Sequence, residues 1–245
     1  MKIYKYIQSV ILFTLFLTLL SGCMHPNERR LENQVPNETQ MEMVQLAVLK
    51  YKEKTGVLPI QTKESDTPIF EKYVIDFQQL LNHQLIPSIP SHSFEAGGLF
   101  QYVLVDVESE KPMVKLIDLR IARKIGELQL RVNDYLRENT YLPVAEIVDG
   151  EYYRLDYKKL NLKKAPEIPS PYSQTYLPII ANREGKLAVD YRLDLYQTLQ
   201  EIDPNSLDPE KDLREILLSK SVFVPAYSFP YTIKDGEPVL RKFSN

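Results

Sequence analysis

Cysteine, tryptophan and histidine are scarce in this sequence, and each shortage excludes a kind of site. The 245 residues include one cysteine, three histidines and no tryptophan. One cysteine can form neither an intrachain disulfide nor a thiolate cluster for a metal. The set His83, His92 and Glu95 lacks the i,i+3 or i,i+4 pairing of a helical metal site. We therefore expect no bound metal and no cofactor.

Catalytic signatures are also missing. The sequence contains no Gly-x-Ser-x-Gly elbow, no Ser-x-x-Lys and no His-Glu-x-x-His. Its one glycine pair, Gly97-Gly98, precedes an expected strand rather than a helix, so it lacks the context of a phosphate-binding loop. We interpret it as a turn with positive φ, with a ligand-contacting loop as the alternative. The net charge of −3, without a basic block, gives no footprint for nucleic acid.

A long apolar run occurs only near the N-terminus. A positively charged start at Lys2 and Lys5 precedes the apolar stretch Val10–Leu20. This stretch is shorter than the roughly 20 residues of a membrane span, and it has the proportions of a signal peptide.

The run ends in Leu-Ser-Gly-Cys at residues 20–23, which resembles the lipobox of bacterial lipoproteins. The resemblance implies cleavage between Gly22 and Cys23 and acylation of Cys23. The lipid, diacylglycerol with palmitate, would then anchor the chain on the extracytoplasmic face of the cell membrane. An ordinary secretory signal with an incidental cysteine is the alternative.

Beyond this segment the chain shows an internal repeat. Tyr51–Ile60 and Tyr135–Val144 share the pattern Tyr, six residues, Leu-Pro and an aliphatic residue, at an offset of 84. A second shared pattern centres on Asp76 and Asp156, and Asp212 begins a weaker, shortened third copy. Whether the units form one domain or two stays open. The predicted order is a removed signal peptide, a lipidated polar tether, two repeat units and a shortened third unit, at residues 1–22, 23–36, 37–118, 119–192 and 193–245.

The periodicity predicts an α+β fold. Each unit is expected to be a helix, then a short helix, then an antiparallel β-hairpin, with the helices packed on antiparallel sheet. Apolar stripes predict helices over Thr39–Thr55, Ile121–Tyr135 and Leu193–Ile202. Thr39 and Glu42 resemble a capping box at the start of the first helix. Hairpins are expected to pair residues 100–107 with 113–119, 177–181 with 186–191, and 231–233 with 238–243.

Two sets of side chains are candidates for chemistry or binding. Asp76, Asp156 and Asp212 occupy matching positions, but Asp is also a favoured helix N-cap, and we interpret all three as caps. Tyrosines crowd a proline-rich stretch, where they could anchor a partner or stack on sugars. The alternative is that these tyrosines pack the second sheet. The candidate binding residues are Tyr152, Tyr153, Tyr172 and Tyr176.

Several segments, spread over nearly the whole length, resemble the YphF-like proteins, an uncharacterised family of lipoproteins from Bacillus-type bacteria. The resemblance implies a location at the membrane and supplies no activity. The segments are residues 20–23, 62–69, 75–77, 94–98, 101–107, 155–160 and 189–192.

Taken together, these features favour a non-enzymatic, membrane-anchored extracytoplasmic module that binds a protein partner or an envelope glycan. The main alternative is a cell-envelope hydrolase that uses carboxylates on glycan or peptide, which predicts a cleft with a pair of carboxylates of perturbed pKa. A transporter substrate-binding lipoprotein is less favoured, because the pattern of alternating parallel strands is not visible.

Overall fold

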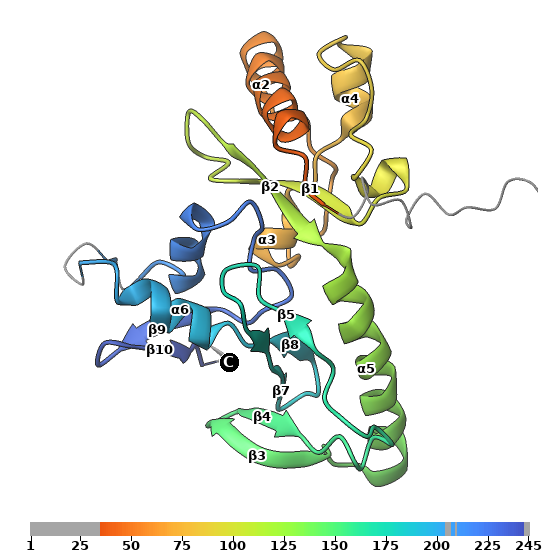
Figure 1. Ribbon diagram of the computed structural model, residues 1–245, viewed down its shortest axis with the longest axis vertical. Coiled ribbons are helices and arrows are strands. Elements are labelled where there is room, and N and C mark those ends of the chain that lie inside the picture. Colours follow the sequence, from red (N-terminus) through yellow and green to blue (C-terminus); the bar gives the residue numbers. More distant parts are fainter. Residues whose placement is uncertain (1–34, 204–206, 209, 243–245) are drawn as a thin grey trace, which may run out of the picture.

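The computed structural model describes residues 35–203, 207–208 and 210–242. The predicted signal peptide, Gly22, Cys23 and the tether up to residue 34 lie outside the described residues. The structure combines helices with small antiparallel sheets, which confirms the predicted α+β class (Figure 1). The helices are α2 (Glu38–Thr55), α3 (Ile69–Lys72), α4 (Phe77–Asn82), η3 (Phe94–Ala96), α5 (Leu119–Asn139), α6 (Arg192–Leu199) and η5 (Leu213–Ser219). The strands are β1 (Phe100–Val105), β2 (Met113–Asp118), β3 (Val144–Asp149), β4 (Tyr152–Leu155), β5 (Ile168–Pro169), β6 (Tyr176–Leu177), β7 (Ile179–Asn182), β8 (Leu187–Val189), β9 (Tyr231–Lys234) and β10 (Glu237–Leu240).

The three predicted helices are present as α2, α5 and α6. One correction concerns the N-terminus of the first, and the third ends at Leu199 rather than Ile202. Asn37, not Thr39, caps α2, because its Oδ1 accepts a hydrogen bond from Gln40 N at 3.0 Å. Asn is as strong an N-cap as Asp or Ser, and starting there places Glu38 in the first turn, near the positive end of the helix dipole. The helix α5 buries the predicted stripe of Ile121, Ile125, Leu128 and Val132.

The three predicted hairpins form as β1–β2, β7–β8 and β9–β10. A fourth hairpin, β3–β4, was not predicted, because three consecutive exposed residues hide its alternation. It extends β7–β8 into a sheet of order β3-β4-β7-β8. The short helix expected in the second unit is wrong. Residues 157–161 form turns, the last of which has Asn161 at φ 57°, in the left-handed region.

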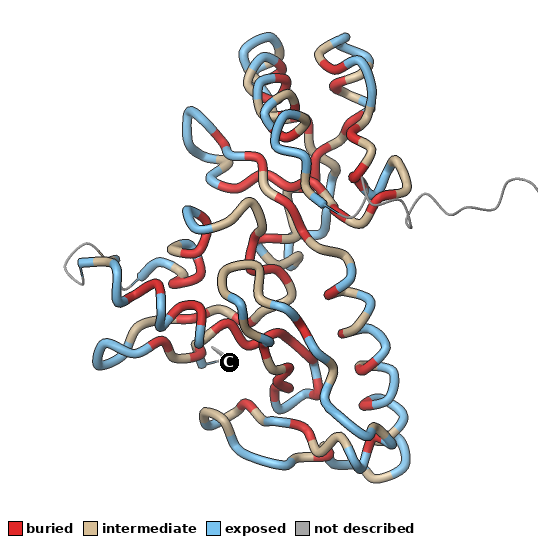
Figure 2. The backbone as a smooth tube through the Cα atoms, in the orientation of Figure 1, coloured by how far each residue is buried: buried red, intermediate tan, exposed pale blue. Residues whose placement is uncertain are grey.

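The core has two main parts joined by a third. One part lies between α2, α4 and the β1–β2 hairpin, and a larger one lies between α5, the four-stranded sheet, α6 and the β9–β10 hairpin. A smaller cluster, which includes Phe70, Ile117 and Val224, connects them. The molecule is elongated, with α2 and α4 at one end and β3–β4 at the other, and buried segments run between the ends (Figures 1 and 2).

A segment near the C-terminus connects these parts. Val224 N donates to Leu116 O at 3.0 Å, so the segment lies beside β2 as an added edge. Tyr227 N donates to Glu71 Oε1 at 2.8 Å, and Tyr227 O accepts from Val189 N at 2.7 Å. One residue therefore bridges the first unit and the four-stranded sheet.

Arg214 is the buried charge in this connecting region, with a side chain only 5% exposed. Its Nη2 lies 2.6 Å from Asp212 Oδ2, and its Nη1 donates to Ser228 O at 2.8 Å. The guanidinium also lies 4.9 Å from the centre of the Phe70 ring. Through these contacts Arg214 joins η5 to Phe70 of the first unit and to Ser228 in the segment before β9.

Substituting Arg214→Gln should lower the free energy of unfolding by about 2–4 kcal/mol, because it removes an enclosed guanidinium together with its hydrogen bonds to Asp212 and Ser228 and its contact with Phe70. The matched control is Arg120→Gln. Arg120 makes the same pair with Asp118, but its side chain is 46% exposed, so the loss should stay below about 1 kcal/mol. Urea unfolding of the two variants measures the difference, and equal losses would contradict the role assigned to burial.

Candidate functional site

The three matching aspartates bind backbone amides. The Oδ1 atoms of Asp76, Asp156 and Asp212 accept hydrogen bonds from the amide two residues later, at 3.0, 3.0 and 3.1 Å. This confirms the capping prediction for Asp76 on α4 and Asp212 on η5, while Asp156 caps a turn. The three carboxylates therefore act locally and belong to no shared cleft.

Sequence reasoning missed a repeated Asp-x-Arg arrangement. In each of three copies the arginine folds back onto the aspartate two residues earlier and forms two-pronged hydrogen bonds with it. Geometry of this kind is specific to guanidinium and carboxylate. The signal was visible in the sequence, as an Asp-x-Arg at the start of each following helix. The pairs are Asp118–Arg120, Asp190–Arg192 and Asp212–Arg214.

The four candidate tyrosines do not form one exposed surface, which corrects that expectation. Tyr152 is 2% exposed, and its hydroxyl donates to Arg241 O at 2.7 Å. Tyr172 donates to Phe223 O at 3.1 Å and packs edge-on against Tyr191.

The other two candidates lie closer to solvent. Tyr153 is half-buried on β4, and Tyr176 is 65% exposed. Tyr152 belongs to the larger core and Tyr172 packs against it, so among the four candidates Tyr176 is the one that is mostly exposed to solvent.

The glycine pair forms a turn, as predicted, at the entry to β1. Gly97 has φ 84°, in the left-handed region. Gly98 is needed for a different reason, because a Cβ there would lie 2.2 Å from the carbonyl carbon of His92. The pair thus allows two backbone segments to touch.

His92 lies beneath this turn and is fully buried. Its Nε2 lies 2.7 Å from the Tyr102 hydroxyl, and burial lowers the pKa of the imidazole. Among the described residues no group of three or more His, Cys, Asp or Glu side chains could hold a metal ion.

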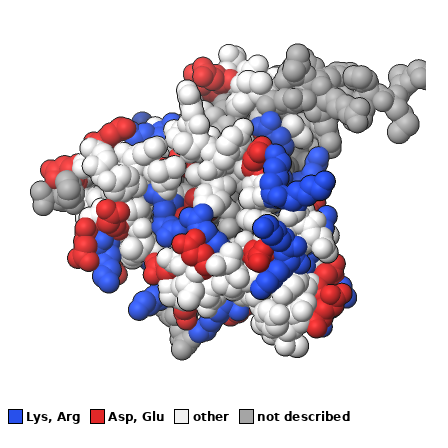
Figure 3. Space-filling model, turned by 60° about the horizontal axis from the view of Figure 1, so that its bottom comes forward, with Lys and Arg blue, Asp and Glu red and all other residues white. Residues whose placement is uncertain are grey.

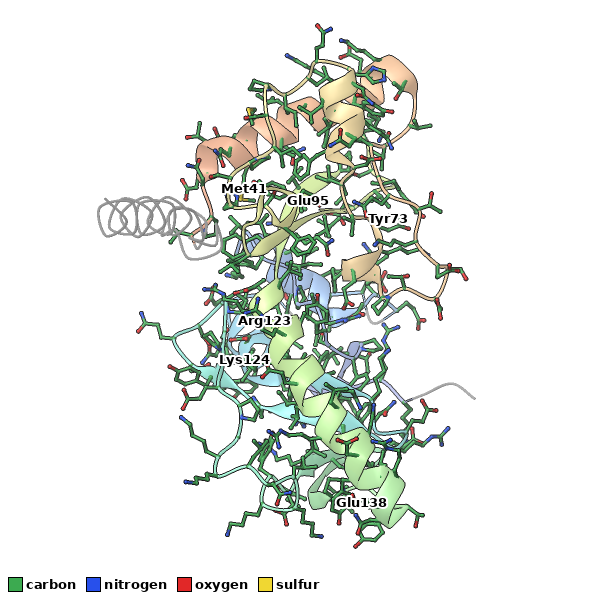
Figure 4. The ribbon with its side chains drawn as sticks, turned by 90° about the vertical axis from the view of Figure 1, so that its right-hand side faces the viewer. Met41, Tyr73, Glu95, Arg123, Lys124 and Glu138 are labelled. Carbon is green, nitrogen blue, oxygen red and sulfur yellow. The ribbon has the colours of Figure 1, made fainter. Side chains whose placement is uncertain are left out.

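Three hollows remain as candidate binding sites. One, about 450 Å³, lies along α5, where Lys124 and Arg131 are balanced by Glu127 and Asp134. Both signs also lie close together over the end of the molecule shown in Figure 3, and Arg123 and Lys124 follow each other on α5 in Figure 4. A second cavity, about 190 Å³, lies between β2 and the 169–171 turn. Neither offers a ligand a distinctive charge.

The third hollow, which we call the acidic hollow, has both an apolar floor and a net charge. It occupies about 400 Å³ between α3, the β1–β2 turn and η5. Its floor is lined by Phe70, Leu104, Val105 and Leu218, all buried. Its rim carries three carboxylates and one amine, from Asp106, Glu108, Glu215 and Lys211.

Glu215 is the rim residue whose carboxyl pKa is shifted. Burial raises the pKa of its carboxyl. Lys211 opposes this shift, whereas Asp106 adds to it. A carboxylate held near other carboxylates favours the approach of a cation.

Comparison with known proteins identifies the first unit. A family model, that of the YphF family N-terminal domain, matches residues 37–118. Residues 37–118 are therefore similar to that domain, and we call this part of the chain the YphF domain. The earlier resemblance is thereby confirmed for this part of the chain, and the matched range is that of the first predicted unit. No curated protein and no solved structure matches the chain. No helix among the described residues is long and apolar enough to cross a membrane.

The acidic hollow is lined on one side by the YphF domain and on the other by residues that follow it in the chain. Ile69, Tyr73 and the turn at 106–109 come from the YphF domain, while Lys211, Glu215 and Leu218 come from the chain after it. In Figure 4, Tyr73 lies in the half of the molecule that contains the YphF domain. Sequence reasoning missed the hollow, because its two walls are about a hundred residues apart.

Substituting Gly98→Ala should destabilise the YphF domain by about 3 kcal/mol, because the new methyl group meets His92 backbone that cannot yield. The control is Gly126→Ala in α5, where a Cβ meets nothing within 4 Å. That change should stabilise by about 0.5–1 kcal/mol. Thermal unfolding of both variants tests the pair, and a neutral Gly98→Ala would contradict the close approach.

His92 should make stability depend on pH below neutrality. Its ordinary pKa is 6.5 and burial lowers it, so the unfolded chain binds a proton that the folded chain excludes. The free energy of unfolding should therefore fall as pH drops below about 6.5, and part of that fall should vanish in His92→Gln. The control is His83→Gln at an exposed position. Urea midpoints at pH 7.5 and 5.5 give the comparison, and identical slopes in wild type and His92→Gln would refute it.

Proposed function

We propose that the protein is a lipid-anchored extracytoplasmic module that binds a partner at the cell envelope without catalysis. The anchor is the lipid on Cys23, inferred from the lipobox-like Leu-Ser-Gly-Cys at residues 20–23. The observation that carries the binding function is the acidic hollow, where uncovered apolar surface meets a concentration of one charge. Such surfaces are where soluble domains receive partners.

We further propose that the chain arose by duplication, so that related units build its surface. Gly56 N donates to Lys52 O at 2.8 Å, and Thr140 N donates to Leu136 O at 2.9 Å, at the same offset of 84. The bonds that follow match as well. Asp76 N donates to Pro59 O and Asp156 N to Pro143 O, at 2.8 and 2.6 Å.

A protein partner fits better than an envelope glycan. Sugar sites rely on exposed aromatic faces, and two of the four candidate tyrosines use their rings and hydroxyls internally. The acidic hollow offers an aliphatic floor instead. A transporter substrate-binding role is less favoured, since the described strands pair antiparallel in small sheets rather than in two parallel lobes.

An envelope hydrolase is the second candidate, and one observation favours it. Glu215 has a raised pKa in a hollow with Asp106 and Glu108, as a general acid requires. Incubating the full chain with purified peptidoglycan tests it. Turnover that disappears in Glu215→Gln would replace the binding function with catalysis.

The binding function is tested on the full chain in native membranes. Metabolic labelling with a fatty acid should mark the wild type and leave Cys23→Ala unlabelled. Cross-linking followed by purification should recover one protein with the lipidated form and lose at least about 90% of it with Cys23→Ala, because the anchor raises local concentration. Equal labelling of both forms would refute the anchor. Recovery of no protein with either form would refute the partner.

A further inference from the structure

We propose that the acidic hollow receives an apolar segment of a partner protein that carries lysine or arginine next to its apolar anchor. This rests on the proposed binding function and names the chemistry of the partner. Three features of the hollow support it: its floor, its charge and the way its rim is held.

The floor is apolar and one of its walls is uncovered. Phe70 and Leu218 are buried, whereas Ile69 at the edge is 49% exposed. A volume of about 400 Å³ lies within the range of about 300–1,000 Å³ that is typical of ligand pockets. An apolar side chain entering here would cover Ile69 and complete the packing over Phe70.

The rim selects for positive charge. Asp106, Glu108 and Glu215 form no ion pair with any residue in the part of the chain that the structure describes, and Lys211 is the one cation in the lining. Two carboxylates thus remain in excess over the amine. A lysine or arginine of the partner would relieve the repulsion among them, and an acidic segment would add to it.

The rim is held in place before any ligand arrives. Ser109 N donates to Asp106 O at 2.9 Å and closes the turn. From α2, Lys52 Nζ donates to Ser109 O at 2.7 Å and braces the same turn against the helix. On the opposite wall, Asp212 caps η5 three residues before Glu215. Preorganised walls reduce the ordering that binding requires.

The floor decides between a protein segment and a small polycation. A fully hydrated polyamine would satisfy the carboxylates but would leave the apolar floor and Ile69 uncovered. A peptide with alternating aliphatic and basic side chains satisfies both at once. A small polycation is therefore an outcome of the test rather than the proposed ligand.

The test uses the full lipidated chain in nanodiscs of phosphatidylcholine, whose zero net charge removes charge attraction between the probe and the lipid. Nanodiscs without protein measure the partition of each peptide into the lipid, which is subtracted. The probe is a fluorescent peptide with alternating leucine and lysine, titrated by anisotropy. Two matched peptides replace every lysine by glutamate or every leucine by serine. Binding is expected for the first peptide, at least about tenfold weaker binding for the serine peptide, and none for the glutamate peptide. Spermidine that competes at equal concentration would overturn the proposal in favour of a small polycation.

Variants locate the binding. The double variant E108Q/E215Q should weaken the leucine–lysine peptide about fivefold and reduce its salt dependence, and I69S should weaken it by a similar factor. The controls are E138Q at the far end of α5 and L130S on its exposed face, which should bind as wild type does (Figure 4). Equal affinity of all variants would overturn the assignment to the acidic hollow.

The experiment distinguishes an error in the assignment to the acidic hollow from an error in the proposed binding function. If native membranes yield the same cross-linked protein with wild type and with I69S/E215Q, the module binds its partner elsewhere and only this inference falls. If no protein is recovered with wild type, the binding function itself falls.

Discussion

The buried pair of Arg214 and Asp212 is the contact on which the arrangement of this protein depends. A guanidinium removed from water must have its donors satisfied, and the donors of Arg214 reach Asp212 and Ser228 while its face covers Phe70. Those partners lie in the YphF domain, at the start of η5 and in the segment before β9. One side chain therefore fixes three parts of the chain relative to one another. The acidic hollow exists because η5 is held against α3 in this way.

The same local arrangement has a different role at each of its three positions. Asp118–Arg120 lies at the start of α5, where the Arg120 side chain is 46% exposed and screening weakens the pair. Asp190–Arg192 is more buried, and its carboxylate also accepts from the Tyr231 hydroxyl at 3.1 Å. Only at Arg214 is the cation itself enclosed. All three Asp-x-Arg pairs lie at the start of a helix, and the pair with the buried arginine also connects separate parts of the chain.

The anchor and the hollow together give the proposed binding function its geometry. A lipid at Cys23 would confine the chain to a membrane surface, and the hollow would present an apolar floor with excess negative charge to whatever lies beside it. Confinement raises the chance of encounter, and charge selects among the partners encountered. The matching aspartates of the repeat have a separate, local role, because their carboxylates accept hydrogen bonds from nearby backbone amides.

The sequence by itself determined the local structure of this protein, since the period of apolar residues, the caps and the turn glycines act within a few residues of one another. It predicted the α+β class, the stripe buried by α5, the three hairpins and the capping role of Asp76 and Asp212. It could not predict the β3–β4 hairpin. The edge strand β3 exposes three consecutive residues, and the hairpin is held in the sheet by the pairing of β4 with β7. It also could not show that Tyr152 is buried or that Glu215 lies near Asp106. Those facts depend on contacts between residues far apart in the chain, and only the tertiary structure decided them.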